Sequence, residues 1–241
     1  MNNLYEGWEL SYFDQADNFR NYEFSLCKNY ISGKTAEVGP GTGENIKYYF
    51  DKVSNLHLYE TSQTLFDGLK KRTESYSNIK LLSQSFKNTN ENFDTIIYLD
   101  VIEHIKDDRE EIINAYSKLN KNGRLIINVP AFNILFSKFD KDVGHFRRYN
   151  KKNLLEIFSK LDVDIKQLKY FDSIGFFFSL LSKIIGNPKS NFGTKIKILP
   201  SLSKIDLHLD NSSRGFDICS ITPQRVMILK LLLSKLVFDI A

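Results

Sequence analysis

The chain has 241 residues, with 33 Lys and Arg against 29 Asp and Glu, which leaves a formal net charge of +4 at pH 7. Hydrophobic residues make up 42% and charged residues 26%, so the composition excludes a disordered, collagen-like or coiled-coil protein and suffices for a globular core. The mild charge gives no reason to expect DNA binding, which usually rests on a concentrated basic face.

The two cysteines and the apolar segments indicate the cellular compartment of the protein. Cys27 and Cys219 lie far apart and form no metal-binding spacing, so reduced thiols are expected. The chain does not open with a basic segment followed by an apolar run, and no apolar stretch reaches the ~18 residues of a membrane span. We therefore expect a cytoplasmic location.

Short strands alternate with helices along most of the chain. The first thirty residues have an aromatic, helical pattern. Beyond them the pattern predicts strands at 34–38, 56–59, 79–82, 93–99, 124–129, 163–170 and 216–222, and helices at 45–53, 62–76, 107–119 and 152–161. This alternation predicts a parallel, doubly wound, Rossmann-like α/β sheet.

We interpret the chain as one domain built of four consecutive parts. They are an N-terminal helical lid (1–33), a cofactor-binding core (34–130), a substrate-side half with a cap insertion (131–215), and a last strand with an apolar tail (216–241). The segments 171–185 and 225–238 are rich in apolar residues, and 225–238 has a helical pattern. Each either packs on the core or serves an amphiphilic acceptor and peripheral membrane contact.

A glycine-rich turn follows the first predicted strand. Residues 37–43 read Glu-Val-Gly-Pro-Gly-Thr-Gly, so Glu37 is followed by Gly39, Gly41 and Gly43. Residues without a Cβ let the chain turn sharply and let a ligand approach the backbone, and the predicted helix at 45–53 would offer N–H groups to an anion. However, Glu44 stands where the dinucleotide fingerprint has its third glycine, which disfavours a pyrophosphate.

An acidic, glycine-rich turn instead suits a cofactor that carries hydroxyls and a positive charge. S-adenosyl-L-methionine has both. Glu60 ends the second predicted strand, where a carboxylate can accept hydrogen bonds from both ribose hydroxyls, and Asp100 ends the fourth. The glycine turn, with Glu37 at its start, and these two acids together indicate a site for S-adenosyl-L-methionine, and we expect Glu37 to bind the cofactor as well.

Four motifs carry a family resemblance: E-V-G-P-G-T-G, Y-E, F-D-T-I-I-Y-L-D-V-I-E-H-I and G-R-L-I-I-N-V-P. They resemble class I S-adenosylmethionine-dependent methyltransferases, in the group that includes the ubiquinone-biosynthesis O-methyltransferases. The resemblance covers residues 34–130 and continues more loosely through G-H-F-R-R-Y-N-K-K-N-L. It implies a seven-stranded, mostly parallel sheet with an antiparallel last strand, and a cofactor across the carboxyl ends of the first, second and fourth strands.

The resemblance also assigns residues to the cofactor. By position, Gly39, Gly41 and Gly43 shape the loop on the methionine side, and Glu60 holds the ribose. Many relatives have an Asp near the adenine after the third strand. This chain reads L-L-S-Q-S-F there, so Ser85 or Gln84 takes that place.

Two histidines are candidates for catalysis. His104 follows the fourth predicted strand, where its side chain can face the transferred methyl group, and imidazole suits general-base work near neutral pH. Alternatively it packs against or hydrogen-bonds a neighbouring loop. His145 is the second candidate base, or else it orients Arg147.

The same segment supplies candidate substrate contacts in Arg147, Arg148 and Tyr149. A local excess of cations from 138 to 152 suits an acceptor with a phosphate or carboxylate, which Arg binds through two hydrogen bonds. The alternative is a solvated helix start in which Arg147 pairs with an internal acid.

Our preferred interpretation is methyl transfer to O or N of a small-molecule or lipid- or glycan-linked metabolite, without a metal. A second hypothesis is a metal-dependent RNA 2′-O-methyltransferase, because Asp100, Glu103 and His104 resemble part of the E-x-x-E-H pattern of such enzymes and would suit Mg²⁺. The modest net charge weighs against RNA. A third is a cofactor-binding subunit that has lost its chemistry.

Overall fold

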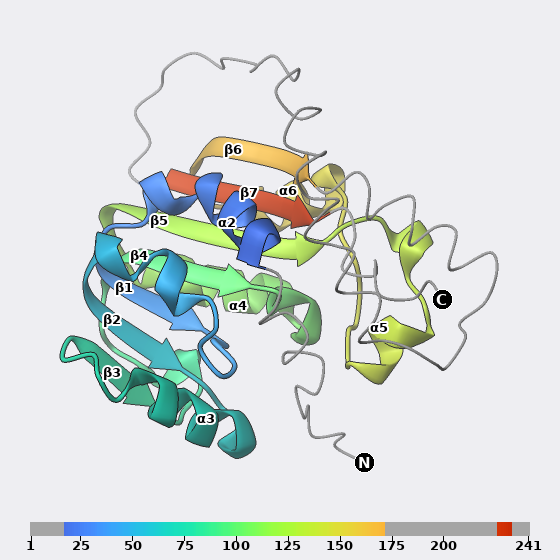
Figure 1. Ribbon diagram of the computed structural model, residues 1–241. Coiled ribbons are helices and arrows are strands. Elements are labelled where there is room, and N and C mark those ends of the chain that lie inside the picture. The colour runs from blue at the N-terminus through green and yellow to red at the C-terminus, as the bar shows by residue number, and fades with distance from the viewer. Residues whose placement is uncertain (1–16, 172–225, 233–241) are drawn as a thin grey trace.

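The computed structural model describes residues 17–171 and 226–232 (Figure 1). Its helices are α2 (Asp17–Ser25), α3 (Gln63–Thr73), α4 (Asp108–Ser117), α5 (Lys138–Asp142) and α6 (Lys151–Phe158). Its strands are β1 (Gly33–Val38), β2 (Val53–Tyr59), β3 (Ile79–Leu82), β4 (Phe93–Leu99), β5 (Leu119–Pro130), β6 (Asp164–Phe171) and β7 (Val226–Leu232). The α/β architecture expected from the sequence is confirmed.

The strands form one sheet in the order β3-β2-β1-β4-β5-β7-β6. Each neighbouring pair is parallel. The chain winds outward from β1 to β3 and then returns to the other side of β1 with β4, so the strand order reverses between β1 and β4. In open α/β sheets this reversal leaves a crevice at the carboxyl ends of the strands, which is where ligands bind.

The last strand differs from the expectation in position and direction. β7 lies inside the 225–238 segment predicted as a helix, and it pairs in parallel with β5 and β6, which contradicts the expected antiparallel strand. An apolar run of this length has the same pattern in a helix and in a buried strand. Its direction depends on the connection, and residues 172–225 are long enough for the crossover that a parallel return requires.

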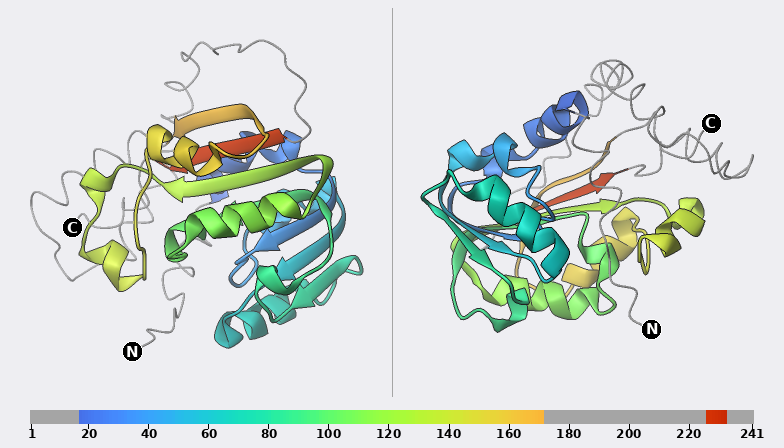
Figure 2. Two further views of the ribbon diagram at one scale, coloured as in Figure 1. Left: turned by 180° about the vertical axis from the view of Figure 1, so that it is seen from behind. Right: turned by 60° about the horizontal axis from the view of Figure 1, so that its bottom comes forward.

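Helices cover both faces of the sheet (Figure 2). On one face, α2 and α3 pack against a cluster that includes Phe24, Leu58, Leu69, Ile97 and Leu99. On the other face, α4 and α6 pack against a cluster that includes Ile96, Tyr98, Ile112, Leu125 and Leu154. Alternate residues of β4 therefore point into two different apolar layers, and this explains why its sequence is continuously apolar.

Polar side chains begin the helices where the sequence predicts them. Asp107 Oδ1 accepts a hydrogen bond from the Glu110 N–H at 3.1 Å at the start of α4, and Ser62 Oγ accepts one from the Leu65 N–H at the start of α3. The predicted helix at 45–53 is wrong: two 3₁₀ turns, Ile46–Tyr48 and Phe50–Lys52, replace it. Tyr49, at φ −138°, interrupts the helical path between them.

Several sequence predictions lie outside the described residues. They concern residues 1–16 of the lid, the cap segment beyond Phe171, the strand at 216–222 and Cys219. Cys27 is a buried thiol. In the ranges 17–171 and 226–232, no helix has the length and apolar character that crossing a membrane requires.

Candidate functional site

A cavity of about 540 Å³ opens at the carboxyl ends of β1, β2 and β4. This is the crevice that the reversal of strand order creates. Its wall contains six of the residues predicted to act in the site, namely Gly39, Gly41, Glu60, Ser85, Asp100 and His104. The remaining predicted site residues, Glu37, Gly43, His145, Arg147, Arg148 and Tyr149, do not line it.

The glycine turn forms one wall of the cavity. Gly39 has a φ of +67°, and a Cβ at this position would lie 2.7 Å from Val101 Cγ2, so only glycine fits without strain. Gly43 has a φ of +85° and packs away from the cavity, where a Cβ would lie 2.8 Å from Leu69 Cδ1. Because 3₁₀ turns follow the loop, the helix N-terminus expected beside the cofactor is not formed.

Glu60 presents a fixed carboxylate to the cavity. Its Oε2 accepts a hydrogen bond from the Gly41 N–H at 3.1 Å, and its Oε1 accepts one from the Ser62 N–H at 2.8 Å. The residue is only 5% exposed, and burial raises the pKa of its carboxyl group. Each oxygen keeps acceptor capacity beside its backbone donor, so the carboxylate can accept two hydroxyl groups from a ligand.

Glu37 lies beneath the cavity instead of in its wall. Its carboxylate is buried and accepts a hydrogen bond from the Tyr49 hydroxyl. Burial raises the pKa of Glu37 to about 7, although the Tyr49 hydrogen bond acts in the opposite direction. The prediction that Glu37 touches the cofactor is therefore not supported, because its side chain fastens the segment after the glycine turn to β1.

Arg20 is a cavity residue that the sequence analysis missed. It comes from α2, is 7% exposed, and its Nη1 lies 2.6 Å from Glu23 Oε2. Burial lowers the pKa of Arg20, but the carboxylates of Glu23 and Asp100 outweigh burial and raise it. The far side of Glu23 accepts a hydrogen bond from Asn128 on β5, which anchors α2 to the sheet. A single Arg in an aromatic helix carries no motif that could reveal this role.

The segment after β3 forms another part of the wall. Gln84, Ser85, Phe86 and Lys87 all line the cavity, as expected for the region that replaces the usual acid. The Ser85 hydroxyl oxygen accepts a hydrogen bond from the Lys87 N–H at 3.3 Å, which begins a 3₁₀ turn. Phe86 packs edge-on against Tyr59, with ring centroids 4.9 Å apart.

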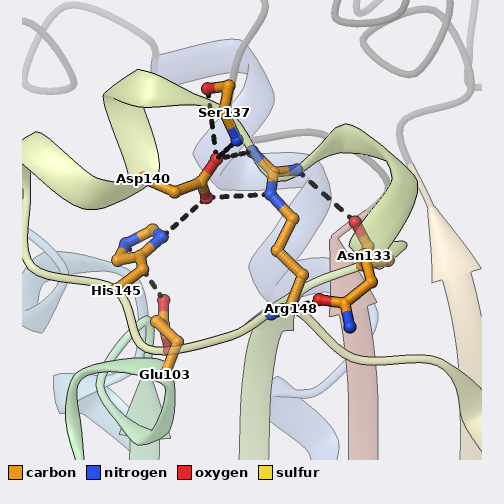
Figure 3. Close-up of polar contacts among 7 residues, drawn as sticks. Glu103, Asn133, Ser137, Asp140, His145 and Arg148 are labelled. Atoms are coloured by element: carbon orange, nitrogen blue, oxygen red, sulfur yellow. Dashed lines mark hydrogen bonds and ion pairs between the residues drawn. The ribbon is translucent and has the colours of Figure 1, made fainter.

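His104 lies where the cavity meets a buried cluster of polar residues. Its ring contacts His145 edge-on, with centroids 4.6 Å apart, and the side chains of His145 and Glu103 are almost fully buried. His145 Nδ1 lies 2.8 Å from Asp140 Oδ1, and its Nε2 lies 3.9 Å from Glu103 Oε1 (Figure 3). His145 therefore lies behind the cavity wall, in contact with the ring of His104, which lines the cavity.

Arg148 and Tyr149 are not placed to bind a substrate, which corrects the prediction. The Arg148 guanidinium is fully buried, and its Nε and Nη2 donate to the two carboxylate oxygens of Asp140 at 2.8 and 3.1 Å. The Tyr149 hydroxyl donates to Asp108 Oδ2 at 2.8 Å. Both side chains hydrogen-bond to acidic residues inside the protein, and the spacing of residues in the sequence did not reveal these partners.

Arg147 pairs with an acid of the protein, which was the alternative to substrate binding. Its Nη1 lies 2.6 Å from Asp108 Oδ2, and its Nη2 donates to the Lys106 carbonyl oxygen at 2.6 Å. The guanidinium thus pairs with an acid at the start of α4.

Comparisons with known proteins agree with this geometry. A model of the methyltransferase domain family matches residues 15–168, which is more than half of the chain. A search of curated proteins finds no significant match. Among solved structures, a candidate methyltransferase from Bacillus halodurans is similar with a TM-score of 0.51, at 13% identity, over 59% of this chain and 68% of that one.

Two further solved structures appear among the similar ones. The YcgJ protein from Bacillus subtilis has a TM-score of 0.50 and 14% identity, over 59% of this chain and 67% of its own. The N-methyltransferase NodS from Bradyrhizobium japonicum, solved with S-adenosyl-L-homocysteine, has a TM-score of 0.49 and 19% identity, over 64% and 79%. By its family match and the position of its cavity, the chain belongs to the methyltransferase domain family and is a class I S-adenosylmethionine-dependent methyltransferase.

Proposed function

We propose that this enzyme methylates an oxygen or nitrogen atom of a small-molecule or lipid- or glycan-linked acceptor, as the ubiquinone-biosynthesis O-methyltransferase group does with its own acceptors. The observation that carries the proposal is the way polar groups are distributed over the cavity wall. Its wall combines a glycine turn and Glu60 at one part with the imidazole of His104 at another. Such a wall suits a cofactor at the glycine turn and an acceptor beside the imidazole.

The residues of the wall fit S-adenosyl-L-methionine by their chemistry. Glu60 would accept hydrogen bonds from the ribose hydroxyls, and Gly39 and Gly41 line the same cavity. Arg20 would bind the carboxylate of the methionine part, because a buried guanidinium forms strong charge-assisted hydrogen bonds. Ser85 and Gln84 would bind the adenine. When bound, this cofactor supplies an electrophilic methyl group on a sulfonium ion.

His104 is the residue that we assign to the acceptor. Methyl transfer is an in-line displacement, so the enzyme mainly has to align the acceptor and remove a proton if the acceptor carries one. His104 lines the cavity and contacts His145, so its ring is held in place while it faces the acceptor. His145, which does not line the cavity, would position the His104 ring through this contact.

Two exposed apolar side chains support an amphiphilic acceptor. Phe146 is 54% exposed and follows His145, and Ile134 is 64% exposed on the neighbouring turn Asn133–Leu135. Exposed apolar groups on the segment that carries His145 and on this turn suit an apolar part of the acceptor or a peripheral membrane contact. RNA as the acceptor is the competing outcome.

Transfer of a labelled methyl group tests the proposal. The protein is incubated with labelled S-adenosyl-L-methionine and an extract of the source cells, which is then divided into organic, soluble small-molecule and RNA fractions. Label in the organic or soluble fraction supports the proposed acceptor, whereas label in RNA contradicts it. The Glu60→Ala variant is the matched control, because it keeps His104 and lacks the proposed ribose contact.

A further inference from the structure

Glu111 is an acid of the cavity wall to which the proposed cofactor contacts give no role. It lies in the first turn of α4, is 4% exposed, and lines the cavity. A buried carboxylate is costly unless hydrogen-bond donors surround it. We propose that Glu111 accepts a hydrogen bond from the 6-amino group of the cofactor's adenine, and so selects adenine over a base that carries an oxygen at this position.

Side-chain contacts connect Glu111 with the part of the wall that follows β3. The Tyr98 hydroxyl donates to Glu111 Oε1 at 2.7 Å, and its ring packs edge-on against Phe86, with centroids 6.4 Å apart. Lys118 Nζ lies 5.3 Å from the Phe86 ring centre and donates to the Lys87 carbonyl oxygen at 3.3 Å. Burial lowers the pKa of Lys118, and the nearby Glu111 carboxylate acts in the opposite direction. Glu111 therefore lies beside the segment to which the proposed function assigns the adenine.

The segment after β3 has no acid of its own. Residues 83–90 read Ser-Gln-Ser-Phe-Lys-Asn-Thr-Asn, where many relatives have an Asp near the adenine. The Ser85 hydroxyl oxygen already accepts the Lys87 N–H at 3.3 Å. The Gln84 amide can both donate and accept, so it does not distinguish an amino group from an oxygen. A carboxylate only accepts, and Glu111 thus supplies the discrimination that the segment lacks.

The other acids of the wall have different partners. Glu60 is assigned to the ribose, and Glu44 forms an ion pair with an arginine of α3. The Asp100 carboxylate interacts electrostatically with Arg20. Among the described residues of the wall, Glu111 is the remaining acid.

Tyr98 holds the Glu111 carboxylate as an acceptor. Burial, together with the charge of Glu111 and the hydrogen bond to it, raises the pKa of Tyr98 well above its ordinary value, so the hydroxyl keeps its proton and donates. A carboxylate has about four acceptor positions, and Tyr98 occupies one. The amino group of adenine offers an N–H donor to a free position. An oxygen in its place would face the carboxylate without a proton between them, and buried polar groups left unpaired reduce affinity strongly.

Calorimetric comparison of two ligands tests the inference on the wild type alone. S-adenosyl-L-homocysteine and S-inosyl-L-homocysteine differ only in the base, which is adenine in the first and hypoxanthine, with an oxygen at position 6, in the second. We expect at least about tenfold tighter binding of the adenine ligand. The inference rests on the proposed function, and the two fail differently. Equal affinities would overturn the role of Glu111 and leave the cofactor assignment intact, whereas no binding of either ligand would overturn both.

The variant Glu111→Gln identifies the residue responsible for the preference. Its amide keeps an acceptor for the Tyr98 hydroxyl and adds a donor for the hypoxanthine oxygen, so the preference for adenine should fall at least about fivefold. Glu110→Gln is the matched control, because Glu110 is an exposed neighbour on the same helix, loses the same charge and does not line the cavity. It should keep the wild-type preference. An undiminished preference in Glu111→Gln, or an equal loss in both variants, would overturn the inference.

Discussion

Asp140 is the residue that organises the buried side of the site. Burial alone would raise the pKa of its carboxyl group, but the hydrogen bond from His145 and the pairing with Arg148 outweigh burial and lower the pKa to about 2. The Ser137 N–H also donates to Asp140 Oδ2, at 2.9 Å. The sequence could not indicate this role, because nothing in the spacing of Arg147 and Arg148 tells which of them faces an internal acid.

Replacement of Arg148 should therefore destabilise the protein far more than replacement of Arg147. Arg148→Ala leaves a buried carboxylate without its guanidinium, which costs about 3 to 5 kcal/mol, whereas Arg147→Ala removes a partly exposed pair worth up to about 1 kcal/mol. Urea unfolding measures both. Equal midpoints for the two variants would contradict the structural role of Arg148.

Glu37 predicts a pH dependence of stability. Its folded pKa of about 7 is above the ordinary value of 4.5, so its contribution is fully present below pH 4.5 and is lost as the pH rises through 7. From pH 5 to pH 8 the wild type should lose roughly 2 to 3 kcal/mol relative to Glu37→Gln, which cannot ionise. Urea unfolding at both pH values measures this loss.

The control for that experiment is Glu74→Gln, which removes an exposed carboxylate after α3. It should follow the pH profile of the wild type. If Glu37→Gln follows the wild-type profile as well, the Glu37 carboxyl group does not titrate as described.

The glycine turn is the element on which the cavity depends. The sequence predicts the carboxyl ends of β1 to β5 within one residue, because their runs are apolar and bounded by polar or glycine residues, but β2 and β5 begin at Val53 and Leu119, before the predicted starts at 56 and 124. It fails between the turn and β2: the pattern of residues 45–53 is helical, but Tyr49 turns inward to its hydrogen bond with Glu37. A tertiary contact thus overrides a local preference.

Gly39→Ala tests the steric limit of this turn. The added methyl group would lie 2.7 Å from Val101 Cγ2, at a φ of +67°, so we expect a loss of about 1 to 3 kcal/mol in unfolding free energy. The double variant Gly39→Ala/Val101→Ala removes the clash but keeps the backbone strain. Its loss of unfolding free energy should therefore be smaller than the sum of the losses measured for the two single variants. Thermal unfolding separates the variants, and unchanged stability of Gly39→Ala would contradict the close approach.

The site as a whole is assembled from segments that are distant in the sequence. Glu60 and Asp100 could be predicted because parallel strands place their carboxyl ends at one edge of the sheet. Arg20 and the pair of His145 with Asp140 could not, because they arrive on a helix and a loop whose docking follows from tertiary packing. The apolar pattern of β7 likewise could not define its direction.

Calorimetric titration with S-adenosyl-L-homocysteine tests the assignment of the cavity most directly. The wild type should bind one molecule per chain, and Glu60→Ala should bind roughly 10 to 150 times more weakly, since hydrogen bonds to a charged group contribute about 1.5 to 3 kcal/mol. Glu74→Ala should bind as the wild type does. No binding to the wild type, or equal affinities of the wild type and Glu60→Ala, would contradict the account.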